Sequence, residues 1–281
     1  MSEALGKRES NTVTLLGVPY DASSSFQRGQ AEAPPRIREA LHSPSSNMWT
    51  EDGTDLGAED ALADAGDVAL TNPDERSQHT RGEIEAAVAG LLGRGARPLV
   101  LGGDHSITYP ALRAFHRVYP RLSILHVDAH PDLYDEFEGD RYSHACPFAR
   151  IMEEGLATRL VQVGIRTMSG HQAEQARRFS VEVIEMRRLD ESLTLNFETP
   201  LYISFDLDGL DPAFAPGVSH RESGGLSVRQ AIALIQGTAA PLVGADVVEF
   251  NPGNDPAGIT APVAAKLVKE LAARMLHGSV H

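Results

Sequence analysis

The sequence predicts an α/β protein, a three-layer α/β/α sandwich with a mostly parallel sheet of eight strands. Short runs of Val, Ile and Leu alternate with segments of helical period along the chain, which is typical of a parallel sheet covered by helices on both faces. Within the runs the apolar residues occupy consecutive positions, as they do in strands buried on both sides. Because no linker divides the sequence, we expect a single domain over 1–281.

The expected elements follow these runs in order. Strands are expected at 13–18, 65–68, 98–101, 122–128, 160–164, 181–186, 201–206 and 242–250. Helices are expected at 81–94, 110–119, 147–154, 172–179, 228–238 and 259–276, and Ser227 is placed to cap the fifth helix. The stretch 43–60 is polar and rich in Gly and Ser, so we expect a surface loop there.

Charge and cysteine content exclude several classes of function. The chain has 25 Lys and Arg against 39 Asp and Glu, a net charge of −14, which argues against nucleic acid or an anionic membrane as partner. One Cys cannot form an internal disulfide or a paired-cysteine metal site, so any metal must be held by nitrogen and oxygen. The N-terminus lacks the apolar segment of a signal peptide, and no stretch approaches about 18 apolar residues, so we expect a cytoplasmic location.

Four of the expected strands end in polar segments. These segments are GGDHS at 102–106, DAHPD at 128–132, DLDG at 206–209 and EFNP at 249–252. In open parallel sheets, ligands bind beyond the carboxyl ends of the strands, so we expect the four segments to converge on one side of the sheet. Each segment alone is more typical of a turn or a helix cap, but several polar segments that all follow strands favour a functional site.

Convergence would bring two His and four Asp together, namely His105, Asp128, His130, Asp132, Asp206 and Asp208. Bare carboxylates this close repel one another, and divalent cations remove that repulsion. Six ligands exceed what one open site needs, whereas two cations that share carboxylates use all six. Residues two apart at a strand end point to the same face, which suits the spacing of these Asp and His residues. Imidazole and carboxylate without thiolate suit Mn²⁺, and zinc, iron, cobalt and nickel are alternatives.

Three blocks of the sequence resemble the signatures of the ureohydrolases, the family of arginase, agmatinase, guanidinobutyrase, proclavaminate amidinohydrolase and formiminoglutamase. The blocks are GGDHS at 102–106, HVDAHPD at 126–132 and SFDLDGLDPAFAPG at 204–217. The resemblance extends from residue 17 to the last expected helix. Stretches such as SSF at 24–26, APPRIR at 33–38, DEFEG at 135–139, YSHA at 142–145 and GADVVEFNP at 244–252 look closest to plant-type arginases and their bacterial relatives.

The resemblance implies two Mn²⁺ ions per subunit, a three-layer fold around an eight-stranded parallel sheet, and a homotrimer or homohexamer. In the family, one ion is held by the residues that match His105, Asp128, Asp132 and Asp206. The other is held by the residues that match His130, Asp128, Asp206 and Asp208. Two of the carboxylates therefore bridge the ions, and all six ligand positions are intact in this chain.

The resemblance also implies a mechanism in which a hydroxide that bridges the two ions attacks the guanidinium carbon. Asp132 would pass a proton to the departing amine, and His144 would act as a proton shuttle. Glu249 would bind the substrate guanidinium through its paired donors. Without the resemblance, His144 would be interpreted as a solvated loop residue and Glu249 as a structural ion-pair partner.

The choice of substrate has three candidates. Overall similarity favours L-arginine, hydrolysed to urea and L-ornithine, with agmatine (hydrolysed to putrescine and urea) second and guanidinobutyrate third. Asp140 stands where plant-type arginases would carry Asn and agmatinases tend to carry an acidic residue. A carboxylate that faced the substrate tail would favour the cationic end of agmatine, although guanidinobutyrases also carry acidic residues there.

Two other classes of protein are disfavoured by the same residues. A regulator without enzyme activity would be expected to lose metal ligands or His144, and all of them are present. A metal-dependent deacetylase of related architecture would lack the block at 204–217 and the segment Ser-His-Ala at 143–145. We therefore expect a metal-dependent amidinohydrolase.

Overall fold

A single parallel sheet organises the chain. The computed structural model of the protein describes residues 12–190 and 193–278. Within these residues eight strands pair in the order β2-β1-β3-β8-β7-β4-β5-β6, and every pair is parallel. The strands are β1 (Val13–Gly17), β2 (Leu62–Asp67), β3 (Arg97–Leu101), β4 (Ser123–Val127), β5 (Arg159–Ile165), β6 (Glu182–Glu185), β7 (Leu201–Asp206) and β8 (Leu242–Val248).

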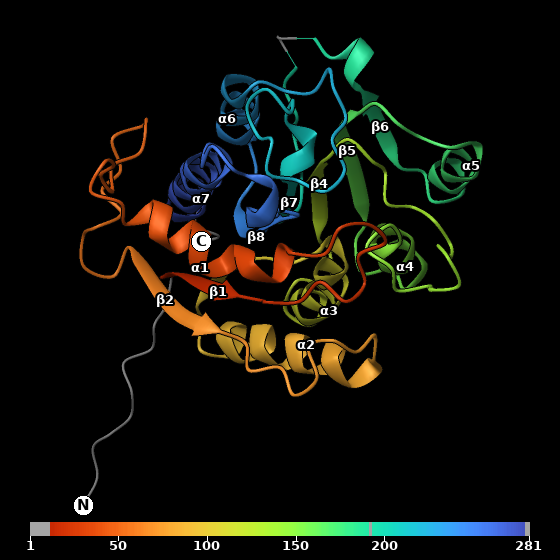
Figure 1. The fold of residues 1–281 in the computed structure, drawn as a ribbon, viewed down its shortest axis with the longest axis horizontal. Helices are drawn as coiled ribbons and strands as arrows, with labels where there is room; N and C mark the ends of the chain where they lie inside the picture. Colours follow the sequence, from red (N-terminus) through yellow and green to blue (C-terminus); the bar gives the residue numbers. More distant parts are fainter. Residues whose placement is uncertain (1–11, 191–192, 279–281) are drawn as a thin grey trace, which may run out of the picture.

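Helices cover both faces of this sheet (Figure 1). One side carries α1 (Ala33–Leu41), α6 (Val228–Gly237) and α7 (Thr260–His277), which pack on one another and on the sheet. The other side carries α2 (Gln78–Gly93), α3 (Thr108–Val118), α4 (Pro147–Glu153) and α5 (Gly170–Arg178). The predicted three-layer α/β/α architecture is therefore confirmed. In the described part of the chain, no helix is long and apolar enough to cross a membrane.

The core forms two apolar clusters, one on each face of the sheet. In β3, Leu99 and Leu101 belong to the cluster under α1, α6 and α7, whereas Val100 belongs to the cluster under α2, α3 and α4. All three side chains are fully buried. Successive residues of a strand point to opposite faces, so a run of consecutive apolar residues fills both clusters.

Most of the elements expected from the sequence are present, with ends that differ by a few residues. The strand expected at 65–68 begins earlier, at Leu62, and the loop expected at 43–60 is confirmed, with turns and one isolated bridge. Ser227 caps α6 as predicted, because its side chain accepts a hydrogen bond from the Gln230 amide. Helix α1 was not predicted, and its first turn contains Pro34 and Pro35. Proline is nevertheless tolerated in the first turn of a helix, where its missing N–H needs no partner.

The order of the strands brings the polar segments together. The four segments noted in the sequence follow β3, β4, β7 and β8. These four strands are neighbours in the sheet, in the order β3-β8-β7-β4. Since all strands are parallel, their carboxyl ends lie along one edge, and the segments that follow them meet there.

Candidate metal and substrate site

A cavity of about 330 Å³ opens at this edge of the sheet. Its lining includes side chains from three of the polar segments, from the loops that follow β1, β4, β5 and β7, and from α5. Its volume is at the lower end of the range for small-molecule sites. The expected site residues that line it are His130, Asp132, His144, Asp206, Asp208 and Glu249. The sequence analysis thus identified six residues of one cavity from separate segments.

The first candidate metal position surrounds His105. Its Nδ1 atom lies 3.0 Å from an Asp132 oxygen, 3.1 Å from an Asp206 oxygen and 3.3 Å from an Asp128 oxygen. The His105 ring is fully buried, and Nδ1 makes no hydrogen bond of acceptable geometry despite these three close oxygens. Oxygen atoms that surround one ring nitrogen without hydrogen-bond geometry are placed to coordinate a cation together with that nitrogen, rather than to share a proton with it.

The second candidate position surrounds His130. Its Nδ1 atom lies 3.1 Å from Oδ2 of Asp208 and 3.4 Å from Oδ1 of Asp128. The three side chains form a group whose ligand atoms all lie within 4.8 Å of one another. Asp128 therefore has one oxygen near His105 and the other near His130, the arrangement required of a ligand shared by two cations.

In the protein without metal, the pKa values of the cluster also indicate an excess of negative charge. Burial and then repulsion by Asp208 and Asp128 raise the pKa of Asp206 well above its usual value. Burial alone would lower the pKa of His130, but Asp208 and Asp128 outweigh it and raise that pKa to about 12. The bare cluster would thus bind protons to offset its carboxylates. Divalent cations provide that compensation, so the residues present fit two such ions.

Close backbone approach shapes the loops that carry these ligands. A Cβ atom on Gly103 would lie 1.7 Å from the carbonyl oxygen of Tyr20, so no other residue fits beside the chain there. Asp132 and Glu249 both have positive φ, at 49° and 64°, a conformation that non-glycine residues rarely adopt. Strained backbone is typical of functional positions, where the surrounding structure holds a side chain in one direction.

Glu249 and His144 form a buried pair next to the carboxylate cluster. Oε1 of Glu249 lies 2.9 Å from Nδ1 of His144 and accepts a hydrogen bond from the backbone amide of His105 (2.9 Å). Oε2 accepts a hydrogen bond from Gln30 (2.8 Å). Burial alone would raise the pKa of Glu249, but His144 outweighs it and brings the pKa to about 2. Burial alone would lower the pKa of His144, and Glu249 raises it to about 9.

Ser25 completes a chain of contacts that leads from this pair toward the cavity. Its Oγ atom lies 2.8 Å from Nε2 of His144, and its backbone amide lies 3.2 Å from the same nitrogen. Ser25 also lines the cavity. The amide can only donate, so its contact favours an unprotonated Nε2, whereas the hydroxyl donates to the neutral ring and can accept from the protonated ring.

His126 contacts the cluster and was not identified from the sequence. Its Nε2 atom lies 2.7 Å from Oδ2 of Asp128, and the ring is fully buried. Gln162 donates one hydrogen bond to the Pro131 carbonyl (2.6 Å), which fixes its amide group, and its nitrogen lies 3.0 Å from Nδ1 of His126. Nδ1 of His126 is therefore the acceptor and Nε2 the donor. His126 orients Asp128 through a hydrogen bond, and the HVDAH spacing at 126–130 was the available signal.

A second set of residues that was not identified from the sequence contacts the other ring nitrogen of His105. Nε2 of His105 lies 3.0 Å from Oγ of Ser204, which donates a hydrogen bond to Asp246 (2.7 Å). Asp246 is fully buried and also accepts hydrogen bonds from Tyr202 and Thr108. Partners of this kind fix the orientation and the tautomer of a metal-binding imidazole.

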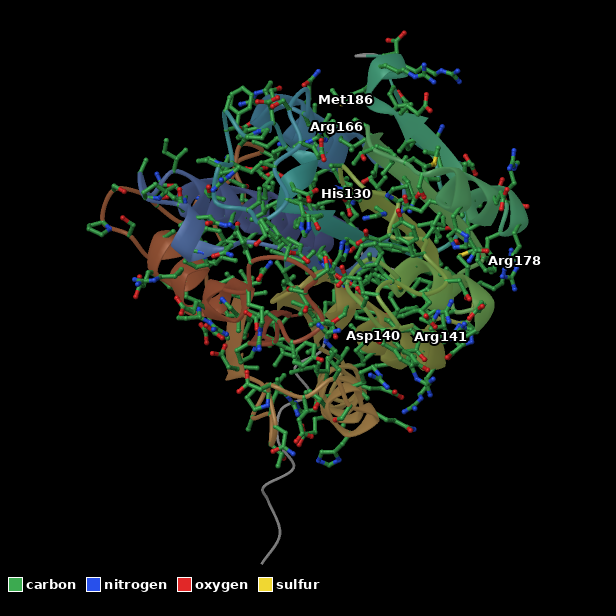
Figure 2. All side chains as sticks on the ribbon, turned by 45° about the vertical axis from the view of Figure 1, so that its right-hand side comes forward. His130, Asp140, Arg141, Arg166, Arg178 and Met186 are labelled. Carbon is green, nitrogen blue, oxygen red and sulfur yellow. The ribbon has the colours of Figure 1, made fainter. Side chains whose placement is uncertain are left out.

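Asp140, the expected reader of the substrate tail, does not line the cavity. Its carboxylate accepts a hydrogen bond from the Tyr142 amide (2.7 Å) and lies 3.6 Å from Nη1 of Arg76. Figure 2 shows Asp140 beside Arg141 and apart from His130. The carboxylate is therefore engaged by its own loop and by Arg76, and the argument for agmatine that rested on this residue loses its support.

Known proteins resemble the chain over almost its entire length. It is 50% identical to arginase 1, mitochondrial, of Arabidopsis thaliana, over 96% of this chain and 83% of that protein. It is 36% identical to guanidinobutyrase of Pseudomonas aeruginosa, over 92% of this chain and 84% of that protein. Among solved structures, arginase from Medicago truncatula matches with a TM-score of 0.91 and 47% identity, over 95% of this chain and 88% of that one.

These names overturn the expected cytoplasmic location. Several of the similar plant arginases are named mitochondrial, and one from Arabidopsis thaliana is named chloroplastic/mitochondrial. The expectation was wrong because it rested on the lack of an apolar signal segment. Signals for mitochondria and chloroplasts are amphipathic and rich in Arg and Ser, so that criterion does not test for them.

The family is identified by a match that covers most of the chain. The sequence model of the Arginase family matches residues 11–273, which include all four polar segments and the residues of the cavity. Together with the parallel sheet and the paired His and Asp clusters at its edge, this match places the chain without ambiguity: it belongs to the arginase family.

Proposed function

We propose that this protein hydrolyses L-arginine to urea and L-ornithine at the cavity described above. The chain is a hydrolase of the guanidino C–N bond, as its family and its 50% identity to a plant arginase indicate. The candidate substrates all carry a guanidinium group and differ in the rest of the molecule. The proposal of L-arginine therefore depends on the part of the cavity that would receive the rest of the molecule.

The observation that carries this choice is the neutral character of the remaining cavity wall. Apart from the residues of the carboxylate cluster and the pair of His144 and Glu249, the lining residues are Ser25, Tyr134, Phe137, Ala145, Thr167, Met168, Ser169, Gln172 and His220. Burial lowers the pKa of His220, so this ring is neutral near pH 7.

A neutral wall suits the tail of arginine better than the tails of the alternatives. The tail of agmatine is a lone ammonium and favours a carboxylate, whereas that of guanidinobutyrate is a lone carboxylate and favours a cation. The tail of arginine carries both charges and is neutral overall. Hydroxyl and amide groups, such as those of Ser25 and Thr167, serve either charge because they both donate and accept.

We propose that two divalent cations, Mn²⁺ by the chemistry of the ligands, occupy the His and Asp clusters. His105, Asp128, Asp132 and Asp206 would hold one, and His130, Asp128, Asp206 and Asp208 the other. When bound, the cations supply the charge that lowers the pKa of a water molecule enough to make it a nucleophile near neutral pH. Ligands limited to imidazole and carboxylate favour Mn²⁺ over metals that prefer thiolate.

The other side chains of the cavity would bind the guanidinium and move protons. Glu249 is ionised and is held in one orientation by Gln30 and the His105 amide, so it would receive the N–H groups of the guanidinium. When the bond between the guanidinium carbon and the side-chain nitrogen breaks, Asp132 would transfer a proton to that nitrogen. His144, between Glu249 and Ser25, would exchange protons between the cavity and solvent.

A direct test compares substrates side by side. The protein is loaded with Mn²⁺, and urea release is measured from L-arginine, agmatine, guanidinobutyrate and guanidinopropionate. We expect kcat/KM to be highest for L-arginine, by at least about tenfold, because the tails differ by a full charge. A preference for agmatine would contradict the argument from the neutral wall, and the absence of urea from all four would contradict the proposed function.

We further propose that residues 1–281 form one domain and that the subunits assemble into a homotrimer or a homohexamer. The unbroken eight-stranded sheet supports the first part, and the resemblance to the ureohydrolases supports the second. Light scattering during size-exclusion chromatography measures the assembly directly, and a monomer would contradict it.

A further inference from the structure

Arg166 follows β5 and donates hydrogen bonds to backbone carbonyls of the ligand-bearing loop. Its guanidinium contacts the carbonyl oxygens of Asp208 (2.6 Å), Gly209 (3.2 Å) and Leu210 (3.1 Å). These three residues are consecutive and end the 3₁₀ turn Leu207–Gly209. Carbonyls at the end of such a turn lack partners within the turn, and a cation is a favourable partner for them.

The same guanidinium joins two further segments to this turn. It donates to the carbonyl oxygen of Gly164 (3.1 Å) near the end of β5. It also donates to the carbonyl oxygen of Glu222 (2.6 and 3.0 Å), in the loop between the 3₁₀ turn and α6. Gly225 leaves room for it, because a Cβ atom there would lie 2.7 Å from Nη2 of Arg166. The backbone around Arg166 is thus arranged to admit the guanidinium, whose rigid fork of N–H groups matches several acceptors at once.

The backbone of Arg166 fixes the neighbouring metal-binding segment as well. Its amide donates to the carbonyl oxygen of Ala129 (3.0 Å), and the amide of Thr167 donates to the same oxygen (3.2 Å). The amide of Ala129 in turn donates to Oδ1 of Asp208 (3.2 Å). Ala129 is fully buried and lies between Asp128 and His130 in sequence, so Arg166 and Asp208 hold it from two sides.

We propose that Arg166 is a positioning residue that sets the relative placement of His130 and Asp208, and with it the affinity of the metal position they share. This inference rests on the proposed function, because it assumes that the two clusters bind metal. Arg166 acts through the backbone of the loops rather than through contact with the ion or the substrate. Its effect is specific to one position, because His105 is held instead by Ser204 and Asp246.

Arg274 provides a matched control. It is also half-buried, and its guanidinium likewise donates to backbone carbonyls, those of Thr238 (2.6 and 3.2 Å) and Ala240 (2.7 Å). These carbonyls precede β8, at the end of the sheet opposite to the cavity. Replacement of Arg274 therefore removes the same kind of contact from the fold without touching the candidate site.

The test measures the binding of Mn²⁺ to Arg166→Met, Arg166→Lys and Arg274→Met by titration monitored with electron paramagnetic resonance. His105→Asn and His130→Asn backgrounds isolate the two positions. In the His105→Asn background, which retains the position of His130, we expect Arg166→Met to weaken binding by about 10- to 100-fold. In the His130→Asn background we expect a change below about threefold. Arg166→Lys keeps the charge without the fork and should fall between wild type and Arg166→Met.

The outcomes separate this inference from the proposed function. Wild-type binding of fewer than two ions would contradict the proposed function and this inference together. Two ions in the wild type with unchanged binding in Arg166→Met would overturn the inference alone. Equal weakening of both positions, or the same loss in Arg274→Met, would show a general effect on the fold and would also overturn it. If Arg166→Met does not fold, Arg166→Lys provides the same comparison with the charge retained.

Discussion

His105 and His130 face the same Asp128 but are held by different means. The His105 ring is fully buried, and its second nitrogen contacts Ser204, which leads to the buried carboxylate of Asp246. The His130 side chain remains 24% exposed and borders the cavity. One imidazole is thus fixed by side chains inside the sheet, whereas the other depends on how the loops beyond the sheet are joined.

This difference indicates how one edge of a sheet builds two unlike candidate metal positions. At His105 the supporting residues come from β7 and β8, whose packing in the core already fixes them. At His130 the support comes from loops, and their backbone needs a separate connection, which Arg166 provides. Substitutions at the two supports should therefore affect one position each, whereas substitution of the shared Asp128 should affect both.

The largest effect is expected for Asp128→Asn. Loss of the shared carboxylate leaves each of the two candidate metal positions with one carboxylate ligand fewer. It also reduces the negative charge that attracts the cations. We expect tight binding of both metal ions to be lost and urea release to fall by more than about 10³-fold. Metal analysis of the purified protein and a urea assay measure this.

The control for that variant is Asp255→Asn. Asp255 accepts hydrogen bonds from the backbone at the start of α7 and does not line the cavity. Its substitution replaces one of the two oxygens that accept these hydrogen bonds by an amide nitrogen, so the stability of the protein should fall by about 1 kcal/mol while both metals remain bound. An Asp128→Asn protein that keeps two ions and full activity would show that the two positions do not share this residue.

A smaller effect, limited to the position of His105, is expected for Ser204→Ala. The substitution separates His105 from Asp246 and leaves the ring without its partner at Nε2. We expect the affinity of the His105 position for Mn²⁺ to fall by about 10- to 100-fold in the His130→Asn background. In the His105→Asn background the affinity should be unchanged. This is the reverse of the result expected for Arg166→Met.

Ser123→Ala is the matched control for Ser204→Ala. Ser123 is a buried serine of the adjacent strand β4, and its hydroxyl contacts Thr199 (2.6 Å) at the opposite end of the sheet. Its substitution by Ala removes one partly buried hydrogen bond at a distance from the candidate ligands. If the two serine variants bind Mn²⁺ equally well, the support of His105 by Ser204 is refuted.

The smallest effect concerns His144, a histidine of the cavity that neither candidate metal position includes. Its pKa is raised to about 9 from an ordinary value of 6.5, whereas the pKa of Glu249 is about 2. The pair therefore stabilises the fold fully below pH 6.5, and this contribution is lost as pH rises through about 9. Glu249 stays ionised throughout that range, so the change belongs to His144.

We expect the wild-type protein to be more stable than His144→Gln near pH 6, by at most about 3 kcal/mol. The difference should shrink steadily between pH 6.5 and 10. Urea denaturation of the two metal-free proteins measures it at each pH, because the metal ligands titrate alike in both proteins and cancel in the difference. A difference that is independent of pH, or that grows as pH rises, would contradict the pairing of His144 with Glu249.

The sequence was sufficient for the parts of the site that follow from strand order. His105, Asp128 and Asp206 stand directly at or just beyond the carboxyl ends of apolar runs, and parallel strands bring such positions to one edge. The same reasoning predicted the sheet and its two helical layers. Roles for His144 and Glu249 came from the family resemblance, and the structure places these two side chains in contact.

The remaining features depend on contacts between residues far apart in sequence. Ser204, Asp246 and Arg166 look like ordinary strand or loop residues, and only the pairing of β7 with β8 and the loop geometry give them their partners. Asp140 shows the opposite error, because the resemblance to agmatinases, which tend to carry an acidic residue at this position, suggested a carboxylate that faces the substrate tail. The turn of its loop directs its carboxylate to the Tyr142 amide instead.

The most direct test of the account is an anomalous difference map, recorded at the manganese absorption edge, from crystals of the protein loaded with Mn²⁺. We expect two peaks about 4 Å apart, one against His105 and the other against His130, with Asp128 in contact with both. A single peak, or a peak bound by His126 in place of His130, would contradict the shared binuclear site on which the proposed function depends.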